Sequence, residues 1–117
     1  MTRVFVELPS FQSDWKDLGL NDNDLRHLQE ELLSNPKIGR VMSGTGGVRK
    51  MRFAFEHSGK RGGVRVIYVD FDVYEKIYLL TAYPKSEKDN LSRAEQNELR
   101  EMVGQLEEEL EYTSRRK

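Results

Sequence analysis

The chain has 117 residues and a formal net charge of −1 at pH 7, with 37% hydrophobic and 33% charged residues. This length fits one domain built around one small core. No run of about 18 apolar residues is present to span a bilayer, and the N-terminus lacks the apolar segment of a signal peptide. The absence of cysteine excludes disulfides and thiolate metal sites, and it fits a reducing cytoplasm.

The first elements are expected to be one strand and two helices. Residues 3–7 alternate between polar and apolar side chains, which predicts a short strand. The apolar residues within 11–20 favour a short helix. Asn21 is the predicted N-cap of a second helix, which is expected to end near Ser34 because Pro36 follows.

The middle of the chain reads as a loop followed by three strands. Residues 39–47 are rich in glycine and are expected to be loop. From residue 48 the apolar pattern has a period of two, which predicts a strand over 48–56 and a glycine-rich hairpin connection over 57–63. Strands are also predicted over 64–71 and 76–83. Short links between consecutive strands indicate an antiparallel meander.

The C-terminal part is expected to be a helix. Ser92 and Glu95 have the spacing of a capping box, and apolar residues at helical spacing continue to about Tyr112, with residues 113–117 expected to be a frayed tail. We therefore predict a single α+β domain over residues 1–117. It has a curved antiparallel sheet, two N-terminal helices and one C-terminal helix, with the helices on one side of the sheet.

Cations are concentrated in residues 35–68. This segment contains eight cations and one acid, Glu56, whereas the rest of the chain sums to about −8. A local positive field on an otherwise acidic chain suits a phosphate-bearing partner. The eight cations are Lys37, Arg40, Arg49, Lys50, Arg52, Lys60, Arg61 and Arg65.

The alternation of side chains along the predicted strands indicates which three of these cations could form one site. Lys50 and Arg52 are two residues apart on one strand, so they project from the same face. Arg65 lies on the next strand, and its face relative to the other two depends on a register that the sequence does not fix. Convergence of the three would create a phosphate site. The competing interpretation is an ordinary solvated sheet face, and the residues alone leave both open.

Further basic and aromatic residues are predicted to contact RNA or the ribosome. Lys60 and Arg61 lie in a glycine-rich turn whose amides suit phosphate, although a hairpin alone explains its glycines. Aromatic rings beside cations suit base stacking, but strand tyrosines more commonly lie at the edge of a core. No metal site is expected, because His27 and His57 are isolated. The predicted binding set is Arg49, Lys60, Arg61, Tyr68 and Lys88.

Four sequence blocks, in order along the chain, resemble a known family. They are NPKIG at 35–39, GTGGVRKMR at 44–52, GKRGGVRVIY at 59–68 and YLLTAYPK at 78–85. Together they resemble the RelE/ParE toxin superfamily over about residues 3–110, and they are most similar to the HigB-type toxins of bacterial type II toxin–antitoxin modules. The second and third blocks form a specific pair of motifs.

This resemblance implies a compact, microbial RNase-like fold and an mRNA interferase that needs no cofactor and no metal. Such toxins enter the ribosomal A site, where a ribose 2′-OH of the message attacks the adjacent phosphate and leaves a cyclic phosphate. That reaction needs a base, an acid and cations. The implied partners are a cognate helix-turn-helix antitoxin, the ribosome and mRNA. DNA would be contacted only through the antitoxin, and a cytoplasmic location without a membrane is expected.

The resemblance also implies roles for individual residues. Lys50 would hold the phosphate or help to deprotonate the 2′-OH, and Arg65 would stabilise the scissile phosphate with its planar fork. Tyr83 and Lys85 lie in the strand-end region that supplies acid or stacking groups. The identity of the general acid stays open. RelE carries an arginine beside the lysine that Lys85 matches, whereas this chain has Ser86 there, and HigB-like members also lack that arginine. The predicted catalytic set is Lys50, Arg52, Arg65, Tyr83 and Lys85.

Two other functions are compatible with the same resemblance. The ParE branch shares the fold and inhibits DNA gyrase without catalysis, but ParE-type chains generally lack the combination of Lys50, Arg52 and Arg65. A degenerate relative could bind an antitoxin without being active. The net charge of −1 is low for a toxin that binds the ribosome, and it leaves room for this third function.

Overall fold

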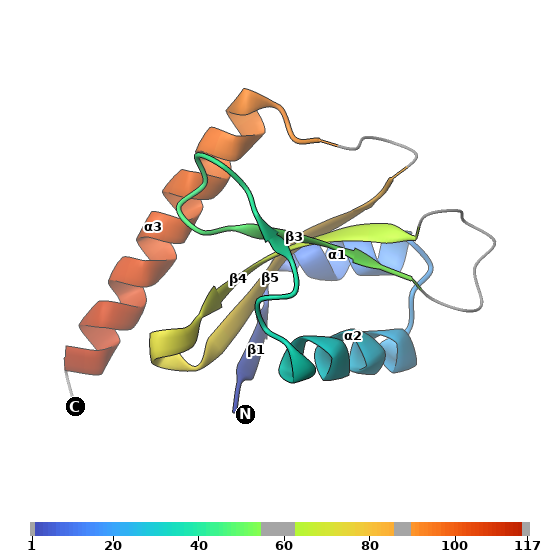
Figure 1. Cartoon of the computed structure of the whole chain (residues 1–117), viewed down its shortest axis with the longest axis horizontal. Coiled ribbons are helices and arrows are strands. Elements are labelled where there is room, and N and C mark those ends of the chain that lie inside the picture. The colour runs from blue at the N-terminus through green and yellow to red at the C-terminus, as the bar shows by residue number, and fades with distance from the viewer. Residues whose placement is uncertain (1, 55–62, 86–89, 116–117) are drawn as a thin grey trace.

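The computed structural model describes residues 2–54, 63–85 and 90–115 (Figure 1). The strands are β1 Val4–Glu7, β2 Arg40–Val41, β3 Arg49–Phe53, β4 Val64–Phe71 and β5 Lys76–Pro84. The helices are α1 Pro9–Asp17, α2 Asp22–Ser34, the short 3₁₀ helix η1 Asp72–Tyr74 and α3 Arg93–Arg115. None of the helices in these segments combines the length and apolar character needed to cross a membrane.

The strands form one mixed sheet in the order β1-β5-β4-β3-β2. The predicted meander of β3, β4 and β5 is confirmed, because both neighbouring pairs are antiparallel. The expectation of a wholly antiparallel sheet is wrong, since β1 pairs with β5 in parallel. More than half of the chain separates β1 from β5, and a parallel pair needs a connection of only about a dozen residues or more.

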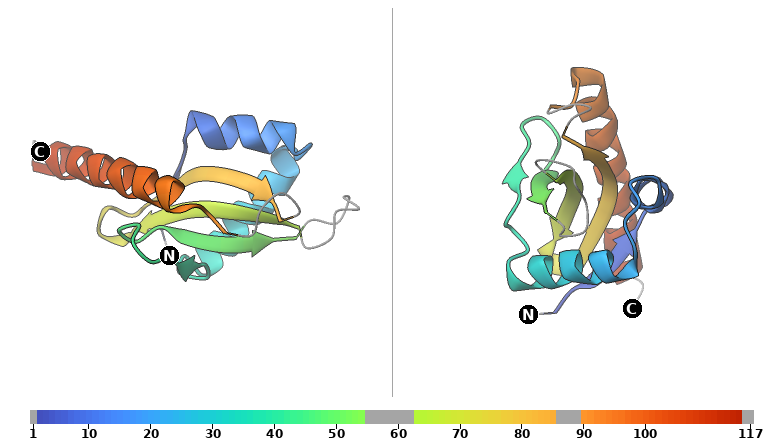
Figure 2. Two further views of the ribbon diagram at one scale, coloured as in Figure 1. Left: turned by 90° about the horizontal axis from the view of Figure 1, so that it is seen from above. Right: turned by 90° about the vertical axis from the view of Figure 1, so that its right-hand side faces the viewer.

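Helices cover both faces of the sheet, and not one face as the sequence had suggested. Helices α1 and α2 pack on one face and α3 packs on the other (Figure 2). The reason lies in β4, which is apolar on both sides and therefore needs cover on both sides. Its residues alternate between the two cores, with Val64, Val66 and Tyr68 in the first and Ile67, Val69 and Phe71 in the second.

Capping residues begin two of the helices where the sequence predicted. In α2 the Asn21 side chain accepts a hydrogen bond from Asp24 N, and the Asp24 carboxylate accepts one from Asn21 N, both at 2.9 Å. Ser92 and Glu95 make the same reciprocal pair before α3. Satisfying these amide groups stabilises a helix start by about 1 kcal/mol.

Several element boundaries differ from the prediction, and β3 covers Arg49–Phe53 where a strand over 48–56 was predicted. Helix α1 already begins at Pro9, because proline suits the first helical position. Strand β2 lies within the stretch expected to be loop, and with two residues it is too short to show a period. Helix α3 continues to Arg115 through part of the predicted frayed tail. No proline or glycine interrupts it there, and a cation in the last turn is favourable to the helix dipole.

Candidate active site

The register of β3 and β4 brings the three predicted cations to one face. Arg52 lies directly opposite Arg65, and Lys50 lies opposite Ile67. Because side chains alternate along a strand, Lys50 and Arg52 share this face with Arg65. The neighbouring strand β2 places Arg40 opposite Lys50. The face that the sequence left undetermined therefore gathers four cations.

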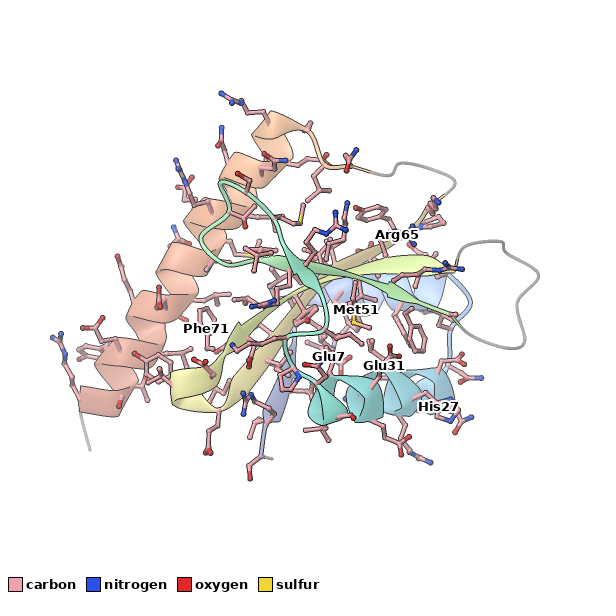
Figure 3. The ribbon with its side chains drawn as sticks, in the orientation of Figure 1. Glu7, His27, Glu31, Met51, Arg65 and Phe71 are labelled. Carbon is pink, nitrogen blue, oxygen red and sulfur yellow. The ribbon has the colours of Figure 1, made fainter. Side chains whose placement is uncertain are left out.

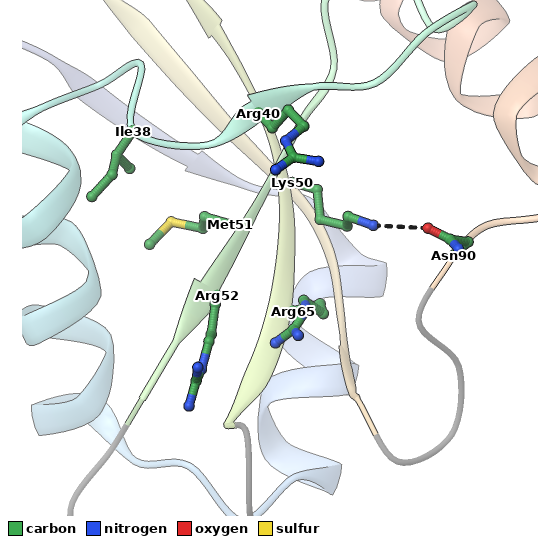
Figure 4. Close-up of a pocket in the computed structure, with 7 residues that line it drawn as sticks. All are labelled: Ile38, Arg40, Lys50, Met51, Arg52, Arg65 and Asn90. Carbon is green, nitrogen blue, oxygen red and sulfur yellow. Dashed lines mark hydrogen bonds between the residues drawn. The ribbon is translucent and has the colours of Figure 1, made fainter.

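These cations line a pocket of about 560 Å³ (Figure 4). Its other described lining residues are apolar or neutral, and none of the described lining residues is an acid. Guanidinium and ammonium groups donate several hydrogen bonds and accept none, so this wall suits an anion with several oxygens, such as a phosphodiester. The lining residues are Ile38, Arg40, Lys50, Met51, Arg52, Arg65 and Asn90.

The pocket is open because α3 covers only part of its sheet face. Figure 3 shows Phe71 beside α3, whereas Arg65 lies near the other end of β4, away from this helix. Phe71 is 7% exposed and belongs to the core under α3. One strand thus supplies a packed core at one end and an accessible cation at the other.

Asn90 approaches Lys50 from the far side of the pocket. The Lys50 Nζ donates a hydrogen bond of 3.2 Å to the Asn90 side-chain oxygen (Figure 4). Asn90 is followed by the buried Leu91 and by the capping box of Ser92 and Glu95. The segment that carries Asn90 is therefore anchored, and Asn90 can orient the Lys50 ammonium group.

Tyr68 lies in the core and cannot contact a nucleic acid, whereas the predicted contact of the half-buried Arg49 stays a prediction. Tyr68 is fully buried, at 0% exposure, and its hydroxyl bonds to Gly39 N and Pro36 O. Arg49 donates hydrogen bonds to the carbonyl groups of Gly39 and Lys37. The prediction of base stacking by Tyr68 is wrong in this structure, because no face of its ring reaches the surface. Both residues point away from the cationic pocket and stabilise a loop.

Tyr83 and Lys85 lie at the end of β5, outside the lining of the cationic pocket. Tyr83 faces Arg65 in the register of β4 and β5, but it is only 6% exposed. It lines a second pocket of about 330 Å³ between α1, β5 and α3, together with Asp14. The Asp14 carboxylate accepts hydrogen bonds from the Thr81 hydroxyl and Ala82 N, which fixes this part of β5. Lys85 is exposed just after the strand.

Some site predictions fall outside the described residues. Lys60, Arg61 and Lys88 belong to this group, and they remain predictions. Conversely, the structure adds four lining residues that were not predicted to belong to the site: Ile38, Arg40, Met51 and Asn90. Arg40 belonged to the basic segment, but no strand was expected there. Asn90 carried no signal in the sequence beyond its position ahead of a capping box.

The described side chains contain no metal site of the usual ligand types. In residues 2–54, 63–85 and 90–115, no three His, Cys, Asp or Glu side chains are grouped so that they could hold a metal ion. The cations of the pocket are therefore its observed source of positive charge.

Comparison with known proteins agrees with the resemblance seen in the sequence. Residues 2–113 match the family described as the RelE toxin of the RelE/RelB toxin–antitoxin system. The chain belongs to the RelE toxin family. The matched residues include all of the described strands and the first residue of each described helix. The family consists of toxins of toxin–antitoxin systems, and this chain is therefore such a toxin.

A solved structure supports the RelE-like fold. It is a mutant of the E. coli toxin RelE in the free state, in which two arginines are replaced by alanine. The two chains have a TM-score of 0.53 and 16% identical residues, and the match covers 76% of this chain and 90% of that one. The predicted fold is confirmed, and the finer placement in the HigB-type branch stays a prediction.

Proposed function

We propose that this RelE-family chain is a ribosome-dependent mRNA endonuclease that cuts message in the ribosomal A site and thereby inhibits translation. The observation that carries the proposal is the convergence of Lys50, Arg52 and Arg65 on one open pocket. Cleavage within an RNA chain develops negative charge on the phosphate oxygens, and preorganised cations stabilise that charge. A toxin that acts on mRNA needs such a site, whereas a toxin that only binds a protein does not.

The proposed reaction requires no water and no metal ion. The ribose 2′-oxygen attacks the adjacent phosphorus, the bond from phosphorus to the 5′-oxygen breaks, and the products are a 2′,3′-cyclic phosphate and a 5′-hydroxyl end. Lys50 would hold a phosphate oxygen as an ammonium group, or it would take the 2′-OH proton as a neutral amine. Arg52 and Arg65 would hold the equatorial oxygens, since a guanidinium fork can bond two oxygens at once.

The proton for the leaving 5′-oxygen is proposed to come from the end of β5. Tyr83 and Lys85 are both there, and they differ in access. The Tyr83 hydroxyl would have to be uncovered from beneath α3, because the side chain is 6% exposed, whereas Lys85 already faces solvent. Comparing Tyr83→Phe with Lys85→Ala distinguishes the two, because only loss of the donor should slow cleavage while RNA binding is retained.

Expression of the chain from an inducible promoter tests the function. We expect growth and protein synthesis to stop in cells that make the wild type and to continue in cells that make Arg65→Ala. Arg26→Ala is the matched control, because Arg26 is an exposed arginine on α2 outside the pocket. Mapping of RNA 5′ ends should find new ends inside translated frames, and these ends should carry a 5′-hydroxyl.

Other outcomes would identify a different function. Intact message together with arrested DNA replication would reject the nuclease and indicate a gyrase inhibitor of the ParE kind. Intact message with normal growth would indicate an inactive relative that only binds an antitoxin. Cleavage of naked mRNA at the same rate as mRNA on translating ribosomes would reject the ribosome dependence alone.

The proposed partners follow from the family. A toxin of this family is expected to be held inactive by an antitoxin, and we propose one with a helix-turn-helix DNA-binding domain encoded by a neighbouring gene. Contact with DNA would then be made by the antitoxin. Co-expression of the neighbouring gene should restore growth, and co-purification should recover both chains.

A further inference from the structure

The segment Asn35–Gly39, here called the NPKIG loop, lies between α2 and β2 at the edge of the cationic pocket. Two of its residues, Pro36 and Gly39, are held by a buried tyrosine. The Tyr68 hydroxyl donates a hydrogen bond to Pro36 O at 2.9 Å and accepts one from Gly39 N at 2.8 Å. Because Tyr68 is fully buried in the core, the two residues that flank the middle of the loop are fixed to the interior of the protein.

Further contacts hold the rest of the loop. Arg49 Nη1 donates to Gly39 O at 2.7 Å and to Lys37 O at 3.3 Å. The Lys37 ammonium group forms ion pairs with Asp70 and Asp72. Asn35 accepts hydrogen bonds from Lys37 N and Ile38 N. The backbone of the loop is thus fixed through several independent contacts.

The side chain of Ile38 is directed differently. It is 45% exposed, and it lines the cationic pocket. Figure 4 shows Ile38 and Met51 on the side of the pocket toward α2, whereas Asn90 stands on the opposite side. Met51 is only 4% exposed, so among the described lining residues on this side Ile38 supplies most of the apolar surface that a ligand could touch.

Arg52, Arg65 and Ile38 line the same pocket, so a phosphodiester bound at the two arginines would have its adjacent nucleosides within this pocket. A nucleobase has two apolar faces, and burial of apolar surface is favourable in proportion to its area. An aliphatic side chain on a rigid loop can receive a base without a further cost in ordering the protein. A cationic floor combined with one fixed apolar wall therefore has the composition of a nucleotide site, and not only of a phosphate site.

We propose that Ile38 is a specificity-determining residue that packs against a nucleobase next to the scissile phosphate. The inference rests on the proposed endonuclease function and adds a reading of the base to it. A purine presents the larger face, so Ile38 favours cleavage where a purine occupies this position. The remaining loop residues act through Ile38, because they hold its backbone in place.

The test is cleavage of one defined message on translating ribosomes by purified wild type, Ile38→Ala and Ile38→Thr. Ile38→Thr keeps the branch at Cβ and one methyl group, and it replaces the apolar ethyl group with a hydroxyl group. We expect both variants to cut severalfold more slowly at the sites that the wild type prefers, with a more even distribution of nucleotides around the cut. Ile38→Leu should restore rate and distribution. Melting temperatures should match the wild type, because Ile38 lies at the surface.

Val73→Ala is the matched control. Val73 is an exposed apolar residue, at 84%, and it does not line the cationic pocket. This variant should cut like the wild type.

If Ile38→Thr and Ile38→Ala both keep the wild-type cleavage pattern and relative rates, the inference is overturned and the endonuclease function stands. The same holds if they keep the pattern and only escape neutralisation by the antitoxin, which would place Ile38 in a protein interface. If the wild type cuts no message, the proposed function fails and this inference fails with it.

Discussion

Arg52 and Arg65 face each other directly across β3 and β4, in the register that defines the centre of the cationic pocket. Like charges directly opposite each other in a sheet destabilise it, whereas favourable cross-strand pairs stabilise it by about 0.2–1 kcal/mol each. The stability of the folded protein therefore does not explain why two arginines face each other here. An anion that binds between the two side chains relieves the repulsion, so the same geometry that lowers stability favours binding of phosphate.

The first prediction concerns this balance of stability and binding. Arg52→Gln should raise the free energy of unfolding by up to about 1 kcal/mol at low ionic strength, because it removes one of the two facing charges. The gain should shrink in high salt, since Arg52 is exposed and its interactions are screened. Urea denaturation at two ionic strengths measures both effects.

Arg52→Lys serves as the control for the charge. It keeps the repulsion and should leave the unfolding free energy near that of the wild type. Arg52→Gln should also bind a short RNA more weakly and with a smaller dependence on salt concentration. A loss of stability in Arg52→Gln would contradict the argument, because it would mean that Arg52 contributes more through its contacts than it costs through its charge.

Much of the fold was predictable because local signals agree with the final structure. The period of two placed Lys50 and Arg52 on one face, and the capping box at Ser92 marked the start of α3. The parallel pairing of β1 was not predictable, because a strand of four residues carries no information about its partner. The cover on both faces was signalled by β4, whose odd- and even-numbered residues are both mainly apolar.

The site was predictable in part for similar reasons. The alternation of side chains along a strand puts Tyr68 on the face opposite Arg65, and Arg49 on the face opposite Lys50. The sequence therefore already indicated that Tyr68 lies on the other face of the sheet from the cationic pocket. Arg65 lies opposite Arg52 because of the register between β3 and β4. That register depends on how many residues form the connection between the two strands, and the glycines in the sequence do not determine this number. Asn90 reaches the pocket only through tertiary structure.

The second prediction concerns the buried hydroxyl of Tyr68. Tyr68→Phe should lower the unfolding free energy by about 1–3 kcal/mol, because Gly39 N and Pro36 O each lose a hydrogen bond in a buried position. Tyr112→Phe is the control, since Tyr112 is 63% exposed, and it should cost much less. Urea denaturation at neutral pH compares the two variants. Equal costs would show that the hydroxyl of Tyr68 has little effect on stability.

The same residue predicts a response to alkaline pH. Burial raises the pKa of Tyr68 above the ordinary value of 10.0, and the nearby Gly39 N–H and Arg49 offset part of this rise. The protonated form is therefore favoured in the folded state. The contribution to stability is complete below about pH 10 and declines as the pH rises through the folded pKa. Tyr68→Phe should reduce this decline without abolishing it, because burial also raises the pKa of Tyr78.

The third prediction concerns the ion pair that joins the N-terminus to β4. Arg3 bonds both carboxylate oxygens of Asp70, at 2.7 and 3.3 Å, and the two side chains are 10% and 0% exposed. Arg3→Ala should cost about 3 kcal/mol, because a buried carboxylate loses its main partner. Lys37→Ala should cost less than about 1 kcal/mol, because the Lys37 side chain is 51% exposed. Similar costs for the two variants would mean that burial does not determine the strength of these pairs.

The fourth prediction concerns Gly39, where the core and the NPKIG loop meet. A Cβ at this position would lie 2.8 Å from Tyr68 Cε1, 2.9 Å from its hydroxyl and 3.0 Å from Lys50 O. These atoms belong to a buried ring and to the backbone of β3, so neither can move cheaply. Gly39→Ala should therefore cost about 1–3 kcal/mol. It should also slow cleavage beyond what the loss of folded protein explains, because relief of the contact shifts Lys50 or Ile38.

Gly104→Ala makes the same chemical change with the opposite expected sign. Gly104 lies within α3, and outside the helix itself no described atom stands within 4 Å of the position that a Cβ would take. Alanine loses less backbone entropy than glycine when a helix forms, so this variant should gain about 0.5–1 kcal/mol. Thermal and urea denaturation of both variants, with cleavage rates per folded molecule, make the comparison. If Gly39→Ala were as stable and active as Gly104→Ala, the contact between Gly39 and Tyr68 could not be what holds the loop at the pocket.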